Sequence, residues 1–364
     1  MKILHIINSL ATGGAEKLIL ETLPLYAAQG IETDLLLLNG TKYPFLKELE
    51  DKKSCRIFSL GNSSVYHPKH IMKIMPYLKN YDLVHVHLFP AQYYVVLAKI
   101  LARSKTKLIF TEHCTGNRRL DSFWLSVIDK HIYKWYSAIV SITREINDIL
   151  LKHTRLPLKR FHLIENGVNL NTITSAMPYP VEAVNLTLSA TDRIIIQIAA
   201  FREQKDQETL IKAMSLLPTT FKLVLVGEGV QKEKCVNLAT ELRIQDRVFL
   251  LGVRMDVPQL LKTADIVVLS SKYEGMSLSS IEGMASGKPF IASDVPGLSE
   301  IVKGAGVLFP LGDAKKLAEE ILLLATDQKH YDFITKQCLS RAEHYDISIM
   351  VQKHLDLYRE LTKK

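Results

Sequence analysis

Two glutamates in the C-terminal half of the chain stand in a setting that suits ligand binding. The stretch YEGMSLSSIEGMASGKP, residues 273–289, holds Glu274 and Glu282 with seven residues between them, several of which are small. A carboxylate accepts hydrogen bonds, and the vicinal hydroxyls of a ribose can donate two to one carboxylate. The spacing therefore favours a ligand with hydroxyl groups at both ends. In the alternative interpretation, both glutamates are solvated residues at a helix start, where negative charge favours the helix dipole.

The surrounding residues predict how this ligand is held. ADIVVLS, residues 264–270, is typical of a buried strand, and Ser277 is a suitable N-cap for the helix that follows. Four backbone amides before and at the helix start should then be unpaired and able to bind phosphate. They belong to Gly275, Met276, Ser277 and Leu278. With ribose at Glu282, phosphates on the amides and a sugar at Glu274, the segment fits a nucleotide sugar.

Short apolar runs alternate with amphipathic stretches along the whole chain, which is typical of βα units around a parallel sheet. At 364 residues the chain is long enough for two such domains. The segment 168–192 is rich in Pro, Thr, Ser and Asn and lacks periodicity, as linkers do. We expect an N-terminal domain over 1–170, a linker over 171–192 and a C-terminal domain over 193–345. Residues 346–364 should form a helix that packs back on the N-terminal domain.

The strands that this pattern predicts are short and rich in Val, Ile and Leu, which suits strands covered on both faces. In the first half they are KILHII, TDLLLLN, CRIFSL, DLVHVH, KLIFT and SAIVSI; in the second half they are DRIIIQIAA, FKLVLVG, RVFLLG, ADIVVLS, KPFIAS and GVLFP. The predicted fold class is α/β, with two doubly wound, Rossmann-like domains. Ligands of such sheets bind at the carboxyl ends of the strands, so we expect the active site in a cleft between the domains.

Charge and composition narrow the choice of partner. The net charge is +8, and residues 1–170 hold 23 Lys and Arg against 14 Asp and Glu, so the basic excess lies in the first half. This favours an anionic partner there, although solubilising surface charge remains open. The four cysteines are scattered and should be reduced thiols. No apolar run approaches the roughly 20 residues that span a bilayer, and the apolar start is too short for a signal peptide.

The C-terminal motif resembles the Glu-x7-Glu motif of retaining glycosyltransferases of family four, which have the two-domain GT-B fold. Further segments resemble that family in the expected order. They are INSLATGGAEKLI, IENGVNL, FREQKDQETLIKAM, VLVGEG and GKPFIASDVPGLSEIV. Together these segments extend over most of the chain, so the resemblance implies two facing Rossmann-like domains and a nucleotide-sugar donor.

The resemblance also implies roles for individual residues. In the family a basic segment supplies Arg and Lys to the donor diphosphate, and here Lys205 matches the Lys. The commoner pattern has Arg where this chain has Ala200; Arg202 follows two residues later, as in a variant of the pattern. Preorganised cations would stabilise the charge of the departing diphosphate. His113 matches a histidine beside the donor sugar. Apart from these matches, the residues from Gly252 to Arg254, which follow RVFLL, are expected to border the base.

Gly13 and Gly14 follow the first strand, and without side chains they let the backbone approach a ligand closely. By resemblance this loop faces the donor phosphates, although a simple tight turn remains possible. No Asp-x-Asp pair, the metal–diphosphate signature of the other glycosyltransferase fold, occurs in the chain. We therefore expect catalysis without a metal or other cofactor, with cations and amides in the metal's place.

These observations predict a retaining transferase that moves a sugar from a UDP- or GDP-linked donor to a glycan or polyprenyl-diphosphate-linked acceptor. Synthesis of cell-surface polysaccharide in the cytoplasm, at the inner face of the plasma membrane, is the expected setting. A nucleotide-sugar epimerase of the same fold is an alternative, which would convert the donor without an acceptor. A basic nucleotide or nucleic-acid binder is a second alternative, but base-stacking motifs are lacking, so we expect no nucleic-acid partner.

Two further features of the first half remain open. His85 and His87 share one face of a strand, but no third metal ligand is apparent in the sequence, so core packing or lining of the acceptor side is expected. A basic, aromatic group of residues suits docking on an anionic bilayer, or else ordinary helix packing. The group comprises Arg103, Lys105, Lys107, Arg118, Arg119, Phe123, Trp124, Tyr133, Trp135 and Tyr136.

Overall fold

The computed structural model describes residues 1–113 and 123–363. Its chain divides into two compact units: one comprises Met1–Gly167 together with Ile347–Lys364, and the other comprises Val168–Asp346. The segment 171–192, predicted from its composition to be a linker, contains two short helices, α8 (Leu170–Thr174) and α9 (Val181–Val184). Helix α8 packs against α12 (Val257–Thr263) and α13 (Leu278–Ala285) of the second unit, so the start of this segment is packed on other helices.

The described part of the first unit contains a seven-stranded parallel sheet with the order β3-β2-β1-β4-β5-β6-β7. All six strands predicted in this half are present, and the short β7 is one that the sequence did not predict. The strands are β1 (Lys2–Ile7), β2 (Glu32–Leu37), β3 (Arg56–Ser59), β4 (Leu83–His87), β5 (Lys107–Glu112), β6 (Ala138–Ser141) and β7 (Phe161–Leu163). The order reverses between β1 and β4, so the carboxyl ends of these two neighbours form the switch point of a doubly wound sheet.

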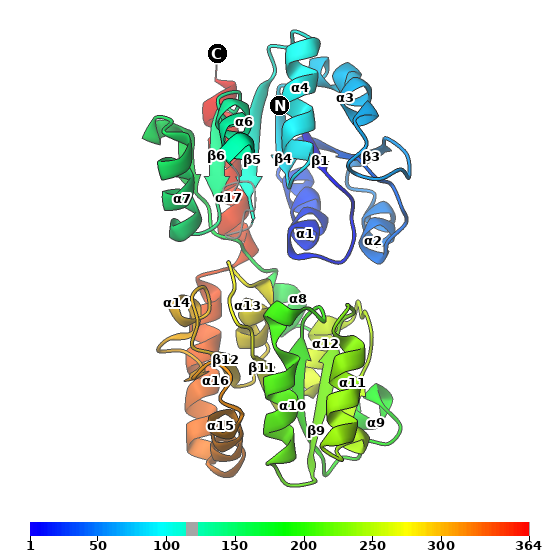
Figure 1. Cartoon of the computed structure of the whole chain (residues 1–364), viewed down its shortest axis with the longest axis vertical. Coiled ribbons are helices and arrows are strands. Elements are labelled where there is room, and N and C mark those ends of the chain that lie inside the picture. Colours follow the sequence, from blue (N-terminus) through cyan, green and yellow to red (C-terminus); the bar gives the residue numbers. More distant parts are fainter. Residues whose placement is uncertain (114–122, 364) are drawn as a thin grey trace. The chain divides into compact units, whose positions relative to one another are not determined.

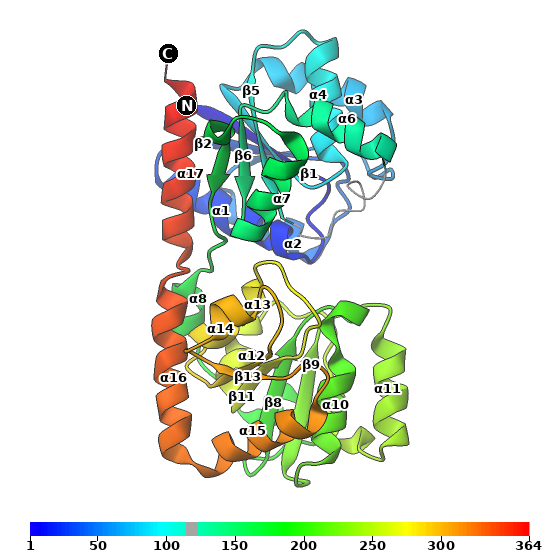
Figure 2. The ribbon, with the colours of Figure 1, turned by 60° about the vertical axis from the view of Figure 1, so that its left-hand side comes forward.

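Helices cover both faces of this sheet (Figure 1). On one face α1 packs against α2 and against the C-terminal helix α17, which runs beside the sheet (Figure 2). On the other face α4 contacts α3 and α6. The bounds are α1 (Gly14–Ala28), α2 (Pro44–Lys52), α3 (Lys69–Ile74), α4 (Ala91–Leu101), α6 (Phe123–Tyr133), α7 (Arg144–Thr154) and α17 (Ile347–Thr362), with 3₁₀ turns η1 (Met75–Lys79) and η2 (Leu158–Arg160).

The stretch AEKLILETLPLYAAQG, residues 15–30, predicts a helix that is closed by Gly30, and α1 ends in this way. Gly30 adopts a φ of +74°, and its amide donates to the carbonyl of Ala27, while the amide of Ile31 reaches the carbonyl of Tyr26. A left-handed residue just past the last turn closes a helix in this way, and glycine adopts that conformation without strain.

The second unit has a six-stranded parallel sheet in its described residues, with the order β10-β9-β8-β11-β12-β13. All six strands predicted in this half are present. They are β8 (Arg193–Ile198), β9 (Phe221–Val226), β10 (Val248–Leu250), β11 (Ile266–Leu269), β12 (Phe290–Ser293) and β13 (Val307–Phe309). The apolar side chains of β11 are at most 2% exposed, as expected for a central strand with both faces covered.

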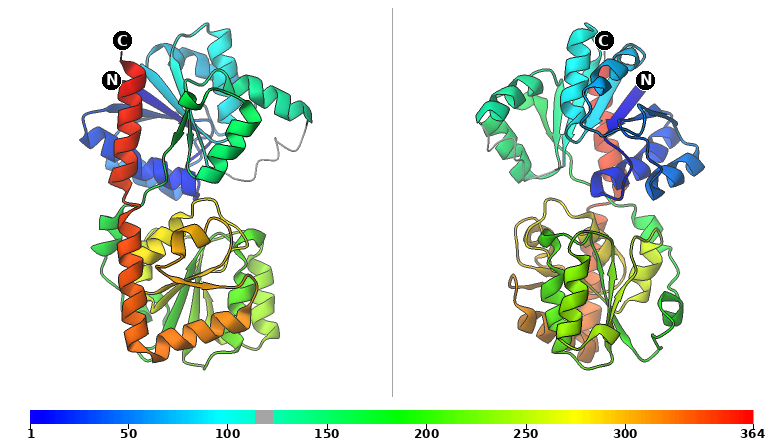
Figure 3. Two further views of the ribbon diagram at one scale, coloured as in Figure 1. Left: turned by 90° about the vertical axis from the view of Figure 1, so that its left-hand side faces the viewer. Right: turned by 45° about the vertical axis from the view of Figure 1, so that its right-hand side comes forward.

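Helices again form two layers around this sheet (Figure 3). Helix α10 contacts α11 and α15, whereas α13 contacts α8 and α16. The remaining helices are α10 (Gln207–Ser215), α11 (Lys232–Glu241), α14 (Ser299–Val302), α15 (Ala314–Thr326) and α16 (Gln328–Glu343), with 3₁₀ turns η3 (Glu203–Lys205) and η4 (Gln245–Arg247). The switch point of this sheet lies between β8 and β11, so the loops that leave those two strands are brought together.

Candidate functional site

The candidate site of the second unit lies at the carboxyl edge of its sheet, where five loops are joined by hydrogen bonds. The loop after β8 is tied to the loops of both neighbouring strands: the amide of Phe201 donates to the carbonyl of Glu228 after β9, and the amide of Lys272 after β11 donates to the carbonyl of Gln204. Further bonds join the β9 loop to the β10 loop and the β11 loop to the β12 loop. The edge is therefore one continuous, fixed backbone surface.

Helix α13 begins at this edge with the cap that the sequence predicts. The hydroxyl of Ser277 accepts a hydrogen bond from the amide of Ser280 at 3.3 Å. Within the described residues, no hydrogen bond engages the amides of Gly275, Ser277 or Leu278. These donors lie at the positive end of the helix dipole, which is the arrangement that binds an anion such as phosphate.

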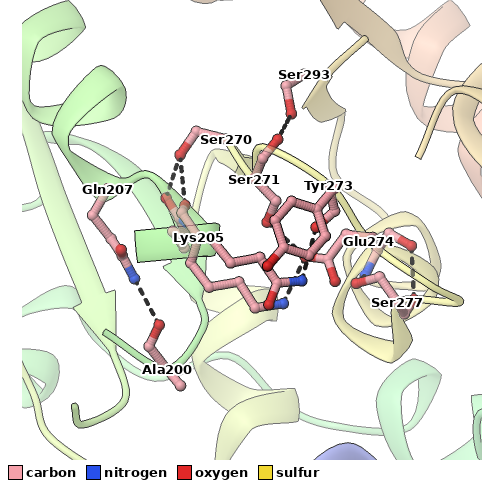
Figure 4. Close-up of polar contacts among 12 residues, drawn as sticks. Ala200, Lys205, Gln207, Ser270, Ser271, Tyr273, Glu274, Ser277 and Ser293 are labelled. Atoms are coloured by element: carbon pink, nitrogen blue, oxygen red, sulfur yellow. Dashed lines mark hydrogen bonds and ion pairs between the residues drawn. The ribbon is translucent and has the colours of Figure 1, made fainter. Parts of the chain in front are cut away.

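Glu274 is held just before that helix by an ion pair and a hydroxyl. Its Oε1 lies 2.6 Å from Nζ of Lys205 and accepts a 2.6 Å hydrogen bond from the hydroxyl of Ser271. Figure 4 shows the Lys205 and Glu274 side chains pointing toward one another. Glu274 is only 7% exposed, so its charge depends on these partners rather than on water. The structure thus brings two of the predicted residues into direct contact.

The position of Lys205 is fixed by side chains that support the loop after β8. The backbone carbonyl of Lys205 accepts hydrogen bonds from the side-chain amide of Gln197 and the hydroxyl of Ser270, and Gln207 donates to the carbonyl of Ala200 at the start of the loop. A short 3₁₀ turn, η3, then ends at Lys205. These hydrogen bonds hold the backbone at Lys205 and so place its ammonium group at the switch point.

Two glycines after β9 explain why the segment VLVGEG accompanies this loop. A Cβ on Gly227 would lie 2.2 Å from the carbonyl oxygen of Ala199, and one on Gly229 would lie 2.3 Å from that of Phe201. Both glycines also have positive φ angles. Only residues without a side chain allow the two loops to approach so closely.

A third glycine supports Glu274 from the β12 side. Gly297 has a φ of +80°, and a Cβ there would lie 2.2 Å from the carbonyl oxygen of Glu274. The amide of Glu274 in turn donates to the carbonyl of Pro296 at 3.3 Å. The segment DVPGL therefore fixes the backbone at the residue that carries the paired carboxylate.

Arg202 differs from Lys205 in having no side-chain partner among the described residues. It is exposed and stands at the N-cap of η3, three residues before Lys205. A guanidinium that is not bound internally is available to a bidentate anion such as phosphate. The two predicted cations thus lie in one turn, and within the described part of the chain only Lys205 has a side-chain partner.

Glu282 and Arg254 occupy different surroundings. Glu282 is 4% exposed and lies one turn after Leu278 on the same side of α13. Arg254 follows β10, two strands away from β8, and its guanidinium binds Asp256 through two hydrogen bonds of 2.8 and 2.5 Å. This hydrogen-bonded pair lowers the pKa of Asp256 below its usual range. In the described residues no contact joins Arg254 to the Lys205–Glu274 pair.

In the first unit, the predicted glycines and histidine lie at the carboxyl ends of strands. Gly13 is the N-cap of α1 and Gly14 is its first residue, after β1. The atoms nearest to a Cβ on Gly13 would belong to the flexible end of the Glu16 side chain, at 2.2 Å, so this glycine is less constrained than Gly227 and Gly229. His113 follows β5, and its Nε2 lies 3.2 Å from Nδ1 of His87.

The structure corrects one expectation about the histidines. His5 on β1 lies opposite His85 on β4, so His85 and His87 do have a histidine neighbour that the sequence did not reveal. One ring nitrogen from each of the three lies within 4.8 Å of those of the others, close enough to share a metal ion. However, both nitrogens of His85 already have hydrogen-bond partners at 2.7 Å, the hydroxyls of Tyr358 and Thr111.

The structure distinguishes between the two interpretations of the aromatic residues in the first half, surface docking and helix packing. Tyr133 and Tyr136 are fully buried against Phe110, whereas Trp135 is 44% exposed. Arg118 and Arg119, with Cys114 and the side chains of Phe123 and Trp124, lie outside the described residues. Exposed apolar side chains occur instead on the neighbouring helices α4 and α6. They are Leu97, Ile100 and Leu101 on α4, and Leu125, Val127 and Ile128 on α6.

No separate signal in the sequence pointed to Ser271 or Gln197, which act only through contacts made in the folded state. Gly297 could have been found, because glycine after proline in a loop often marks a positive φ. The described cysteines, Cys55, Cys235 and Cys338, are free thiols. Over residues 1–113 and 123–363, none of the helices combines the length and apolar character that crossing a bilayer requires.

Comparisons with known proteins agree with this arrangement. The family described as Glycosyl transferases group 1 matches residues 182–338, and Glycosyltransferase Family 4 matches residues 12–172. EpsD of Bacillus subtilis (strain 168), named as a glycosyltransferase, is 30% identical over 81% of this chain and 80% of its own length. The UDP-Gal:alpha-D-GlcNAc-diphosphoundecaprenol alpha-1,3-galactosyltransferase of Escherichia coli is 26% identical over 84% of this chain and 82% of its own length.

The fold has close counterparts among solved structures. Alr3699/HepE of Anabaena, solved in complex with UDP and glucose, has a TM-score of 0.85 over 98% of this chain and 99% of its own, at 21% identity. The likeness supports the assignment of two Rossmann-like, parallel-sheet domains of the GT-B class. These relatives are not epimerases, and that alternative is not favoured. The protein is a glycosyltransferase and belongs to the group 1 glycosyltransferases of family 4.

Proposed function

We propose that the protein is a retaining, metal-independent glycosyltransferase that uses a UDP- or GDP-linked sugar. The acceptor is a hydroxyl of a glycan or of a polyprenyl-diphosphate-linked saccharide, in cell-surface polysaccharide synthesis. The observation that carries the proposal is the ion pair of Lys205 with Glu274 beside the unpaired amides at the start of α13. Cation, carboxylate and amide donors converge at the switch point of a doubly wound sheet, where such folds bind nucleotides.

Each end of a nucleotide sugar has a partner in this arrangement. The amides of Gly275, Ser277 and Leu278 and the guanidinium of Arg202 receive the diphosphate. Glu282, one turn into α13, receives the ribose hydroxyls, and Glu274 receives hydroxyls of the sugar. Lys205 is shared between the carboxylate of Glu274 and the diphosphate, so it couples the position of the sugar to the position of the leaving group.

The chemistry is a substitution at the anomeric carbon. Its bond to the donor phosphate oxygen breaks with the electron pair leaving on that oxygen, while a bond forms to the acceptor hydroxyl on the same face. The acceptor proton passes to the departing phosphate oxygen, so no protein base is consumed. Arg202, Lys205 and the helix amides stabilise the negative charge that develops on the diphosphate. Glu274 orients the sugar and balances the positive charge at that carbon.

The cationic groups beside the helix amides support metal independence. The sequence contains no Asp-x-Asp pair that would hold a diphosphate-bound metal, and two basic side chains lie in one turn beside the phosphate-binding amides. These cations neutralise the charge that a divalent metal ion would otherwise neutralise.

The names of two relatives guide the choice of donor and acceptor. The name of the E. coli relative specifies a UDP-linked galactose and a diphosphoundecaprenol-linked acceptor, and the Anabaena structure contains UDP and glucose. We propose UDP as the first nucleotide to test and a polyprenyl-diphosphate-linked saccharide as the first acceptor class.

A thermal-shift screen of nucleoside diphosphates and nucleotide sugars tests donor binding, because a ligand that binds the folded state raises Tm. UDP or GDP should raise it, and Arg202→Ala should weaken the shift. Transfer is then followed by nucleotide release in the presence of EDTA, and the anomeric configuration of the product is read by NMR. An inverted product contradicts the retaining mechanism, and activity that EDTA abolishes contradicts metal independence. Conversion of the nucleotide sugar without an acceptor would revive the epimerase alternative.

We further propose that the first unit docks on the inner face of the plasma membrane through the α4–α6 face. This face is defined by the exposed apolar residues of α4 and α6 together with Trp135. On α4, Leu97, Ile100 and Leu101 follow the i, i+3, i+4 spacing of one helix side. Exposed basic residues adjoin them, including Arg103 and Lys105 just after α4. Apolar side chains flanked by cations suit an anionic lipid surface, which carries a lipid-linked acceptor.

A further inference from the structure

A line of histidines runs through the first unit from the interior of its sheet to the carboxyl edge. Nδ1 of His5 lies 3.2 Å from Nε2 of His87, and Nδ1 of His87 lies 3.2 Å from Nε2 of His113. The sheet places them in this order, because β1, β4 and β5 are neighbours. His5 lies inside β1, His87 ends β4, and His113 follows β5. The three rings form one continuous hydrogen-bonded chain.

All three rings are neutral at physiological pH. Burial lowers the pKa of His5 to about 3 and that of His113 to about 4, and the pKa of His87 lies well below its ordinary value. A neutral imidazole has one N–H donor and one acceptor nitrogen. Each His–His contact must therefore have its donor on one ring and its acceptor on the next, so the direction at one end fixes the direction throughout.

The buried end of the chain determines that direction. His5 is 1% exposed, and its Nε2 has no hydrogen-bond partner among the described residues. A proton on that nitrogen would leave a buried N–H donor unpaired, which proteins avoid more strictly than an unpaired acceptor. The proton of His5 therefore lies on Nδ1 and is donated to Nε2 of His87. His87 then carries its proton on Nδ1 and donates it to Nε2 of His113.

We propose that His5 and His87 are positioning residues that hold His113 in its Nδ1–H tautomer. Nε2 of His113 is occupied as an acceptor, so Nδ1–H is the group that this ring offers at the carboxyl edge of the sheet. This inference rests on the proposed function, in which His113 lies beside the donor sugar. A fixed N–H donor there binds a sugar hydroxyl oxygen, whereas the other tautomer would present a lone pair.

The side chains around His5, His85 and His87 argue against a metal ion bound between these three rings. A metal on His5, His85 and His87 would need a free ring nitrogen from His85, but Tyr358 and Thr111 engage both. No carboxylate belongs to the group of possible ligands, so the charge of a buried dication would be uncompensated. Hydrogen bonding between neutral rings accounts for the 3.2 Å contacts without that cost.

The test is the tautomer itself, measured by long-range ¹H–¹⁵N NMR on ¹⁵N-histidine-labelled protein. The signals of His113 are assigned by their loss in His113→Gln. We expect Nδ1 of His113 to be protonated in the wild-type protein. In His87→Phe, His113 should lose this preference, and the turnover number should fall by about tenfold, the scale of one lost hydrogen bond. His87→Asn keeps an amide near the position of Nδ1 and should restore the Nδ1–H form.

His354→Phe is the matched control, because His354 is equally buried but bonds Tyr26 outside the chain of three. It should leave the tautomer of His113 unchanged. An Nε2–H signal for His113 in the wild-type protein, or stoichiometric metal with metal-shifted nitrogens, overturns the proposal. If His113 has the Nδ1–H form but His113→Gln transfers sugar at the wild-type rate, the positioning chain stands and the sugar contact in the proposed function fails.

Discussion

The ammonium group of Lys205 lies 2.6 Å from Oε1 of Glu274, so an ion pair joins the loop that follows β8 to the loop that follows β11. The two residues are 69 positions apart in the sequence. They meet because β8 and β11 are neighbours at the point where the strand order reverses. In the proposed mechanism, this pair links the group that receives the sugar to a group that receives the leaving diphosphate.

Replacing Glu274 by Gln should lower kcat for transfer by about 10²-fold, because a misplaced sugar loses the reactive geometry. The glutamine side chain has the same shape as glutamate, and its carbonyl oxygen can still accept the hydrogen bond from the hydroxyl of Ser271, so the protein should remain folded. Steady-state kinetics of nucleotide release measure the effect. Ser271→Ala, which removes one hydrogen bond to Glu274, is the graded control and should cost less than tenfold. A kcat in Glu274→Gln equal to that of the wild-type protein would show that Glu274 has no role in transfer.

Replacing Arg202 and replacing Lys205 should have different effects on the free energy of unfolding. Arg202 is exposed and has no side-chain partner in the described part of the chain, so Arg202→Ala should raise KM for the donor and change the free energy of unfolding by less than about 0.5 kcal/mol. Lys205→Met leaves the buried carboxylate of Glu274 without its cation and should cost about 1–3 kcal/mol. Urea unfolding measures both values.

A double variant distinguishes a lost pair from a general disturbance at this position. Lys205→Met combined with Glu274→Gln leaves no uncompensated charge, so it should recover much of the stability lost in Lys205→Met alone. Transfer activity should remain low, because both functional groups are gone. Purely additive stability losses would show that the two side chains do not interact in solution.

Gly297→Ala should damage the site through the backbone. The added methyl would lie 2.2 Å from the carbonyl oxygen of Glu274 and 2.5 Å from that of Gly275. In addition, residue 297 has a φ of +80°, which is strained for any residue with a side chain. The loop must move, so activity should fall together with stability. Gly304→Ala is the matched control, since Gly304 has a φ of +77° but no atom within 4 Å of the new methyl. It should lose only about 1 kcal/mol of stability from the backbone conformation and retain activity.

The first unit should lose stability steeply in mild acid. Burial lowers the pKa of five clustered histidines below the ordinary value near 6.5; they are His5, His85, His87, His113 and His354. The pKa of the half-buried His162 is lowered in the same direction, also by burial. The unfolded chain then binds more protons than the folded one between pH 6.5 and about 4. The stabilisation is therefore complete above pH 6.5 and is lost as the pH falls, by about 1.4 kcal/mol per pH unit for each histidine.

Urea unfolding of the first unit at pH 5, 6 and 7, followed by hydrogen exchange of amides in β1 and β4, measures this slope. His354→Phe removes one titrating group and should make the slope shallower by about one proton. A stability that does not change between pH 7 and pH 5 would contradict the neutral, buried state of the cluster.

The α4–α6 face should bind vesicles that contain anionic phospholipid. Leu101→Glu combined with Ile128→Glu places two negative charges on this face, at positions that are 59% and 49% exposed in the wild type. Cosedimentation with the vesicles should fall at least tenfold, and wild-type binding should weaken as salt rises. Leu216→Glu combined with Leu323→Glu, at positions of the second unit that are 55% and 44% exposed, adds the same two negative charges and serves as the charge-matched control. Equal loss in the control would assign the effect to net charge alone.

The sequence alone was sufficient to predict the local features of the fold, namely its strands and some of its helix ends. The strand segments are continuous apolar runs because both of their faces are buried, and this property is visible in the residues themselves. The Ser277 cap and the helix end at Gly30 were likewise predicted, since each depends on neighbours within a few residues. The resemblance of its motifs to family 4 pointed to the same fold, which the comparisons support.

Only the tertiary structure decided which side chains meet. Lys205 and Glu274, or His5 and His87 at a separation of 82 residues, become partners through strand order and register, which no short stretch of sequence encodes. The same holds for Tyr133 and Tyr136, whose spacing suits a surface as well as a core until Phe110 is packed against them. Local propensity is a property of neighbours along the chain, whereas a charge pair or a tautomer depends on neighbours in space.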